Sequence, residues 1–167
     1  MVLPVAAQDY PNKAVKVVVP FAAGGGTDIF GRIWAEEMSK TFGQRFLVEN
    51  MPGAAGAIGS KAGIASPADG YTLVLGTAST IAINPHTMGD IGYSPLTELD
   101  PIGLLAYTPW IMVASAKEPY DSIAGMLEYG KANPGDLTYG TWTSTGEMGR
   151  KLLQLRTGVE FLPVPYD

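Results

Sequence analysis

The glycine-rich stretch PFAAGGGTD, which ends at Asp28, is the first candidate binding loop in the sequence. Gly24, Gly25 and Gly26 stand between a valine-rich run and an amphipathic run, so we expect them to follow a strand and precede a helix. In that position, glycines let backbone N–H groups approach an anion at the helix N-terminus. Glycines also suit a turn that needs positive φ or tight packing, and both interpretations stay open. Thr27 or Asp28 is predicted to cap the helix.

These glycines do not match the common nucleotide-binding motifs. No Lys followed by Ser or Thr comes after them, as a P-loop requires, and Ile29 stands where a dinucleotide fingerprint needs Gly or Ala. The carboxylate of Asp28 would also repel a phosphate unless it caps the helix. A small anion is therefore the favoured ligand of this loop.

Two further loops bring hydroxyl groups to the ends of expected strands. They span residues 75–85 and 139–149, and neither contains a Lys or Arg. Each loop alone is more typical of a helix N-cap than of a ligand site, but three such loops in one chain favour binding. The hydroxyl residues concerned are Thr77, Ser79, Thr80, Thr141, Thr143, Ser144 and Thr145.

Catalysis has little support in the sequence. His86 is the only histidine and cysteine is absent, so no metal site is indicated and no cofactor is predicted. The stretch TWTSTG carries half of a Gly-x-Ser-x-Gly elbow, but Trp142 replaces its first glycine. The prediction is a protein that is not an enzyme, and a hydrolase that uses Ser144 or an acidic residue is the alternative. Trp142 and Trp110 could line a cleft or lie in the core.

Composition excludes other classes of partner. The net charge is −5 and the pI is near 4.8, and no cluster of Lys and Arg is present, which argues against a nucleic-acid groove. The apolar runs are broken well before the roughly 18 residues of a membrane span. Residues 1–9 are interpreted as a leader remnant or tag.

Apolar runs and helical periods alternate along the chain, which predicts an α/β fold with a mostly parallel sheet. The expected strands are Val15–Pro20, Phe46–Glu49, Thr72–Gly76, Ile102–Ala106, Ile111–Ser115, Leu137–Gly140 and Val159–Val164. The expected helices are Asp28–Phe42, Ser122–Asn133 and Gly146–Thr157. Residues 78–101 have weak periodicity and are expected to form a long connection.

Five stretches, taken in order, resemble the Bug family, the TctC-like periplasmic solute-binding proteins of tripartite tricarboxylate transporters. They are YPNKAVKVVVPFAAGGGTDIFGR, VENMPGAAGAIGSKAGIASPADGYTLVLGT, INPHTMGDIGYSP, YGKANPGDLTYGT and GVEFLPVPYD. The resemblance covers nearly the whole chain from Tyr10 onward, and the combination PGAAGAIG…SPADGYTL is its most specific part.

This resemblance implies a periplasmic receptor of the Venus-flytrap type, similar to type II periplasmic binding proteins. Two α/β lobes would close on a small carboxylated ligand, which backbone amides and waters hold, and the membrane subunits of the transporter would be partners. Residues 10–105 would form an incomplete first lobe, and residues 106–167 the opening part of the second. Carried onto this sequence, the ligand-binding residues are Phe21, Ala22, Gly24, Gly25, Gly26, Thr27, Asp28, Thr77, Ala78, Ser79, Thr143, Ser144 and Thr145.

The sequence departs from the family in two respects. Glu147 stands where many members carry a His, which is expected to add negative charge near an anion site and could favour a ligand with an amine or neutral polar end. Members are also substantially longer, so a second hypothesis is a fragment that does not bind ligand alone or that self-associates through its incomplete lobes.

Overall fold

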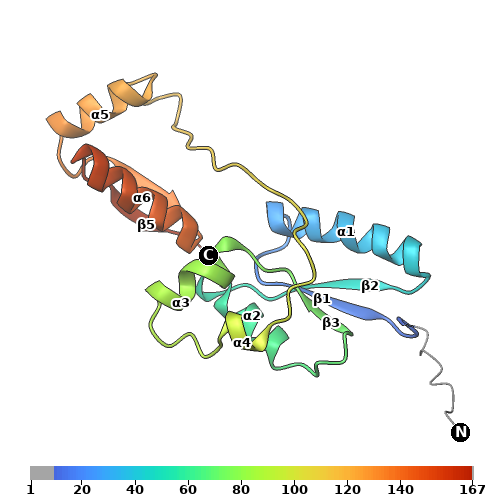
Figure 1. Ribbon diagram of the computed structural model, residues 1–167. Helices are drawn as coiled ribbons and strands as arrows, with labels where there is room; N and C mark the ends of the chain where they lie inside the picture. Colours follow the sequence, from blue (N-terminus) through green and yellow to red (C-terminus); the bar gives the residue numbers. More distant parts are fainter. Residues whose placement is uncertain (1–9, 167) are drawn as a thin grey trace, which may run out of the picture. The chain divides into compact units, whose positions relative to one another are not determined.

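The computed structural model describes residues 10–166, so the predicted leader remnant at residues 1–9 lies outside the described residues. Within that range the chain divides into two compact units, residues 10–98 and 99–166 (Figure 1). The sequence-based prediction placed the division slightly later, after residue 105. Each unit contains its own parallel sheet and its own buried apolar cluster.

The first unit is built on a three-stranded parallel sheet in the order β2-β1-β3. β1 (Val15–Val19) is central, and β2 (Phe46–Asn50) and β3 (Thr72–Val74) flank it, with Val17 opposite Val48 and Leu73. Four of the five β1 residues are buried, which fits a strand covered on both faces. The predicted α/β class and these three strands are confirmed, although β3 is shorter than expected.

Two helices cover the two faces of this sheet, as Figure 1 shows. α1 (Gly26–Phe42) packs Ala35 and Trp34 against a cluster that includes Val17. On the other face, α2 (Ala57–Ile64) brings Gly63 against Val18 and Val74, where an added Cβ would lie 2.3 Å from Val74 Cγ2. α2 was not predicted from the sequence, because AIGSKAGI packs through small residues and has no stripe of large apolar ones.

The segment expected to be a long connection contains several short helices. They are the π-helix η2 (Ser79–Ile83), α3 (Asn84–Thr87) and α4 (Pro95–Glu98), and a 3₁₀ turn, η1 (Ala54–Gly56), precedes α2. Such single turns have too few residues for an apolar period. In α4, local hydrogen bonds hold the turn: Ser94 N donates to the Glu98 carboxylate and Glu98 N donates to Ser94 O.

The second unit is smaller. It comprises α5 (Ile123–Ala132), β4 (Thr138–Thr141), α6 (Ser144–Thr157) and β5 (Leu162–Pro165), with β4 and β5 paired in parallel. Its buried cluster consists of Met126, Leu137, Val159 and Phe161. All four elements were predicted, with shifted ends.

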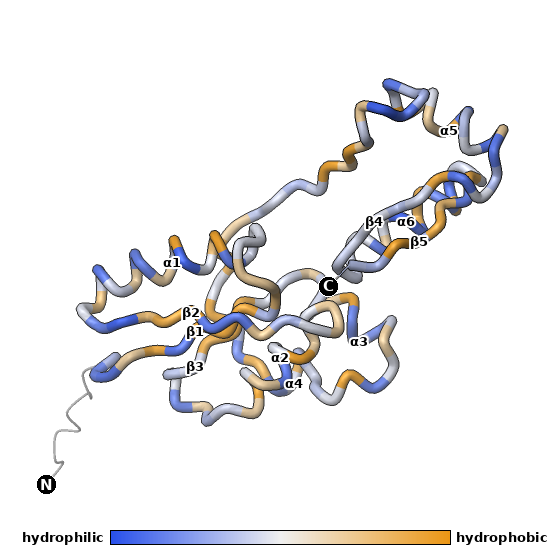
Figure 2. Tube along the Cα trace, turned by 180° about the vertical axis from the view of Figure 1, so that it is seen from behind, coloured by the Kyte–Doolittle hydropathy of each residue, from blue (hydrophilic) through white to orange (hydrophobic). Residues whose placement is uncertain are grey.

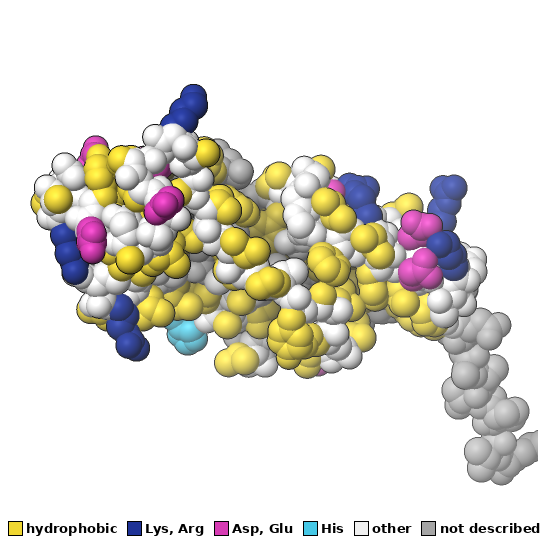
Figure 3. Space-filling view, turned by 90° about the horizontal axis from the view of Figure 1, so that it is seen from above, with side chains coloured by type: hydrophobic (Ala, Val, Ile, Leu, Met, Phe, Trp, Pro, Cys, Tyr) yellow, Lys and Arg dark blue, Asp and Glu magenta, His cyan; other side chains and the backbone are white. Residues whose placement is uncertain are grey.

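The predicted strands at 102–106 and 111–115 are wrong. Residues 99–119 contain no strand or helix, and every residue from 100 to 119 is exposed. A strand requires a hydrogen-bonding neighbour, and the described residues supply none here. Figure 2 shows this extended segment with several strongly hydrophobic stretches. Hydrophobic side chains also cover broad areas of the face of the molecule that is seen in Figure 3. The exposed large apolar side chains of the segment are Ile102, Leu104, Leu105, Tyr107, Trp110, Ile111, Met112 and Val113.

None of the helices within residues 10–166 combines the length and the apolar character needed to cross a bilayer.

Candidate functional site

Three loops of the first unit lie at the same edge of its sheet because they follow the carboxyl ends of three parallel strands. Met51 N, which opens the loop after β2, donates to Val19 O at 2.9 Å, and Leu75 N, which follows β3, donates to Val18 O at 2.9 Å. The loop after β1 begins at Pro20. This edge is where α/β proteins bind ligands.

The three loops converge on Gly56, which has φ +88°. A Cβ added there would lie 2.6 Å from Thr80 Cγ2 and 3.0 Å from Phe21 Cζ. Asn84, which is fully buried, donates from Nδ2 to Ala55 O at 3.1 Å and so fastens the loop after β2 to the helix that follows the loop after β3. PGAAG contributed to the family resemblance, but its place at this edge of the sheet was not predicted from the sequence.

The structure decides what the three glycines do in the fold. Only Gly24 has a positive φ, +85°, so it alone needs glycine for its backbone conformation. A Cβ on Gly26 would meet nothing within 4 Å, and one on Gly25 would make only an ordinary contact with Ala22 O at 3.5 Å. Tight packing therefore explains neither Gly25 nor Gly26.

The backbone donors of this loop are open. Gly25 is the N-cap of α1 and provides no side chain for capping, so the prediction that Thr27 or Asp28 caps the helix is wrong. Among residues 10–166, no acceptor receives the N–H groups of Gly25, Gly26 or Thr27. These groups lie in the first turn of a 17-residue helix, which favours an anion.

Asp28 is buried, with 2% of its surface exposed, and its carboxylate points back to the loop. Its Oδ2 accepts from Gly24 N at 2.8 Å and from Arg32 Nε at 3.0 Å, while its Oδ1 accepts from Asn50 Nδ2 at 2.9 Å. Asn50 Nδ2 also donates to Phe21 O at 3.0 Å. Asp28 is thus an internal acceptor, and it takes the Gly24 N–H away from any ligand.

These hydrogen bonds predict an acid-dependent stability. The Arg32 guanidinium, and next the Gly24 N–H, lower the pKa of Asp28 from its ordinary 3.8 to about 2. A group with a lowered pKa stabilises the fold above its unfolded-state pKa and loses that effect as the pH falls through the folded-state pKa. We expect the stability advantage of the wild type over Asp28→Asn to be full above pH 3.8 and to shrink towards pH 2. Urea unfolding of both proteins at several pH values would measure it, and an advantage independent of pH would contradict it.

Arg32 is a cation that the sequence analysis did not place at the site. The three loops contain no basic residue, but Arg32 lies one turn into α1 and reaches the loop through Asp28. Its Nη2 donates to Asn50 Oδ1 at 2.9 Å, and its side chain is 53% exposed. The four-residue spacing of Asp28 and Arg32 on a helix was the available signal.

The loop after β3 is stabilised internally. Thr77 N donates to Thr80 Oγ1 at 3.0 Å, and Thr80 N donates to Thr77 Oγ1 at 3.4 Å, so the capping interpretation applies to Thr77. Ala78 is exposed, and Ser79 is buried in η2. Only Thr77 and Ala78 of the predicted trio present atoms at the surface.

The candidate loop of the second unit begins α6. Thr143 is its N-cap, and its Oγ1 accepts from Gly146 N at 3.1 Å. Ser144 and Thr145 form the first residues of the helix and are half-buried. Trp142 precedes them, 57% exposed, with its ring centroid 6.1 Å from that of Trp110 within the same unit. Neither indole lies in a core.

Glu147 does not present an unpaired charge to this loop, contrary to the expectation. Arg150 is buried and binds it with two hydrogen bonds, Nε to Oε2 at 2.8 Å and Nη2 to Oε1 at 2.6 Å. Arg150 lowers the pKa of Glu147, so the pair is ionised and neutral overall. Glu147 therefore gives no reason to expect a ligand with an amine or neutral polar end.

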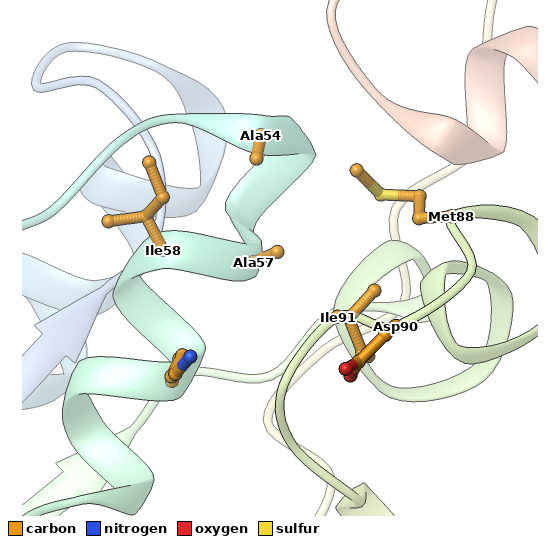
Figure 4. Close-up of a pocket in the computed structure, with 7 residues that line it drawn as sticks. Ala54, Ala57, Ile58, Met88, Asp90 and Ile91 are labelled. Atoms are coloured by element: carbon orange, nitrogen blue, oxygen red, sulfur yellow. The ribbon is translucent and has the colours of Figure 1, made fainter.

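A separate surface depression of about 200 Å³ lies between α2 and residues 88–91 (Figure 4). It is lined by Ala54, Ala57, Ile58, Lys61, Met88, Asp90 and Ile91, none of which was predicted to bind ligand. Within residues 10–166, His, Cys, Asp and Glu form no group of three or more that could hold a metal ion.

Comparison with known families gives a match to the family described as tripartite tricarboxylate transporter family receptor, over residues 30–167. The chain belongs to this family. It is 35% identical to the protein BugT of Bordetella pertussis over 166 residues. The aligned region covers 98% of this chain and 51% of BugT. A UPF0065 protein of Cupriavidus necator is also 35% identical, over 96% of this chain and 49% of its own length.

Solved structures of family proteins share the fold. MatC from Rhodopseudomonas palustris, with bound malate, matches with a TM-score of 0.85 at 29% identity, over 94% of this chain and 54% of MatC. An R. palustris protein with adipate matches with a TM-score of 0.81 at 34% identity, over 95% of this chain and 54% of that protein. The periplasmic binding protein BugD gives 0.80 at 33% identity, over 94% and 53%. The predicted Bug and TctC resemblance and the periplasmic-binding-protein fold are confirmed, and the family is one of receptors.

The chain spans about half the length of the curated relatives it matches.

Proposed function

We propose that this chain provides part of a periplasmic solute receptor that binds a small carboxylated molecule and delivers it to a tripartite tricarboxylate transporter. Residues 10–98 would belong to one lobe and residues 99–166 to the other. The observation that carries the proposal is the open row of N–H groups on Gly25, Gly26 and Thr27 at the N-terminus of α1. Malate and adipate, bound by two relatives, are both carboxylates, which supports the ligand class.

Backbone donors suit this role because they bind a carboxylate without a fixed countercharge, so a neutral loop can release its ligand again. Two features of the loop support it. Gly26 leaves open space where a side chain would stand, a Cβ on Gly25 would make only an ordinary contact, and the Asp28 carboxylate is turned inward and neutralised by Arg32. The membrane subunits of the transporter are proposed as partners from family membership alone.

Binding is tested by calorimetric titration of the purified protein with malate, adipate and a tricarboxylate such as citrate. We expect saturable binding of at least one of them. Heats indistinguishable from dilution for all three, in a protein that melts cooperatively, would contradict the proposal.

A second candidate is favoured by a specific observation: residues 100–119 are all exposed and carry eight large apolar side chains. Under this alternative, the chain binds ligand only when those side chains are covered by further receptor sequence or by a second copy. Analytical ultracentrifugation with and without ligand separates the two, because a monomer that binds carboxylate excludes the alternative.

Gly26→Ala is expected to separate binding from stability. Gly26 is the first residue of α1 with open space around its Cβ position, so alanine should stabilise the fold by about 0.5 kcal/mol. The same methyl group would stand beside the N–H groups offered to the ligand, so we expect the carboxylate affinity to fall about tenfold. Gly103→Ala adds a methyl group in equally open space outside the loop and is the control. Unchanged carboxylate affinity in Gly26→Ala would contradict a ligand-binding role for this glycine loop.

A further inference from the structure

We propose that Asp28, Arg32 and Asn50 are positioning residues that fix the glycine-rich loop, so that the N–H groups of Gly25, Gly26 and Thr27 face a ligand carboxylate. This inference rests on the proposed function of the loop, and it assigns a role to three side chains that need not touch the ligand themselves.

The three side chains form a closed ring of hydrogen bonds. Asp28 Oδ2 accepts from Arg32 Nε at 3.0 Å, Arg32 Nη2 donates to Asn50 Oδ1 at 2.9 Å, and Asn50 Nδ2 donates to Asp28 Oδ1 at 2.9 Å. Each member orients the next, so none of the three is free to rotate without breaking two bonds. A ring of this kind is more rigid than three separate pairs.

The ring holds the loop at both ends. Asn50 Nδ2 donates to Phe21 O at 3.0 Å, where the chain leaves β1, and Asp28 Oδ2 accepts from Gly24 N at 2.8 Å, where the chain turns into α1. The turn at Gly24 requires φ +85°, and the bond to Asp28 maintains it. The next three N–H groups are thereby presented in order along the start of the helix. Preorganised donors lose less entropy on binding than mobile ones.

The ring also sets the charge of the loop. An ionised Asp28 alone would repel a carboxylate held a few residues away, and Arg32 is the cation bonded to it. Asp28 is 2% exposed, while Arg32 is about half exposed, so the positive member of the pair lies nearer to solvent. Removing Arg32 would leave an uncompensated negative charge behind the ligand-facing amides.

The test compares four variants with the wild type. Asp28→Asn replaces one carboxylate oxygen by an amide N–H₂ group. That group cannot accept a hydrogen bond, so the three donors that Asp28 accepts from cannot all keep their acceptor. Arg32→Gln removes the charge, and Arg32→Lys keeps it but loses the fork geometry. Arg45→Gln, an exposed arginine of the same unit outside the ring, is the matched control for a general loss of positive charge.

Two measurements are made on each protein: the dissociation constant for adipate and for malate, and the ¹H–¹⁵N spectrum with hydrogen-exchange rates of residues 24–27 without ligand. We expect affinity to fall about tenfold in Asp28→Asn and in Arg32→Gln, with partial recovery in Arg32→Lys and no change in Arg45→Gln. We also expect faster exchange at Gly24 and shifted Gly25, Gly26 and Thr27 signals in Asp28→Asn.

The outcomes separate this inference from the proposed function. If the wild type binds neither adipate, malate nor citrate, the proposed function fails, and the ligand-free spectra still decide whether the ring positions the loop. If the residue 24–27 signals of Asp28→Asn match those of the wild type, the inference is overturned. It is also overturned if the loop signals change but the affinities do not, or if Arg45→Gln weakens binding as much as Arg32→Gln.

Discussion

Gly59→Ala is expected to destabilise the first unit by about 3 kcal/mol, at the upper end of the range for overpacked sites. The added Cβ would lie 2.5 Å from Met51 O and 2.8 Å from Pro20 Cα, and both are backbone atoms. No side-chain rotation can relieve these contacts, so α2 would have to move away from the sheet edge. Urea unfolding followed by the fluorescence of Trp34, which packs against Phe46 in this unit, would measure the loss.

Gly149→Ala is the matched control for this prediction. Gly149 also lies inside a helix, but its Cβ would meet only Tyr139 Oη at 3.8 Å. There the substitution should stabilise the helix by about 0.5 to 1 kcal/mol. Equal effects of the two substitutions would show that the close approach of α2 does not limit the first unit.

Arg150→Met is expected to destabilise the second unit by about 3 kcal/mol, since it leaves polar partners without their cation. Arg150 is 8% exposed and binds Glu147 through two bonds and Phe161 O through Nη1 at 2.8 Å, which ties α6 to the residue before β5. Methionine has a similar length but donates no hydrogen bond. In a Trp34→Phe background, urea unfolding would be followed by the fluorescence of Trp110 and Trp142, the two tryptophans of the second unit.

The same variant has a consequence for ligand binding. Without Arg150, the Glu147 carboxylate, one turn inside the helix that begins at Thr143, loses its two hydrogen bonds and keeps only the exposed Lys151 Nζ, at 3.7 Å, as an ion-pair partner. We expect weaker carboxylate binding, and recovery of stability when Glu147 is replaced by Leu together with Arg150→Met. Lys151→Met is the control, because Lys151 is 70% exposed and its stability effect should stay within about 0.5 kcal/mol. An equal loss in Lys151→Met would contradict a specific role for Arg150.

The fold class and most of the elements could be predicted from the sequence. β1 is a run of buried valines and α1 has a clear apolar stripe, so each is visible in its own residues. α2 was not predictable in this way, because its packing surface consists of glycines whose fit depends on Pro20 and Val74 elsewhere in the chain. The expected strands at 102–106 and 111–115 failed for a related reason, since apolar composition cannot supply a pairing partner.

The candidate site was predicted less completely than the fold. The glycine loop was found from its position between a strand and a helix, but its internal supports were not. Asn50 is 22 residues from Asp28, and nothing in the local sequence indicates that its amide closes a ring with Arg32. The charge of Glu147 was judged without Arg150, three residues later, because a contact within a helix still depends on rotamers that the sequence does not specify.

The side chains of Asn50 and Asn84 join loops that are distant in sequence, Asn50 from β2 to the loop after β1 and Asn84 from α3 to Ala55. These two side-chain amides thus connect the three loops at the carboxyl edge of the sheet. The three loops should therefore open together as one subglobal unfolding unit, rather than fraying separately as surface loops usually do. In native-state amide hydrogen exchange at low denaturant concentration, the protected amides of the three loops would share one opening free energy. A ligand that contacts only one loop would then slow hydrogen exchange in the other two.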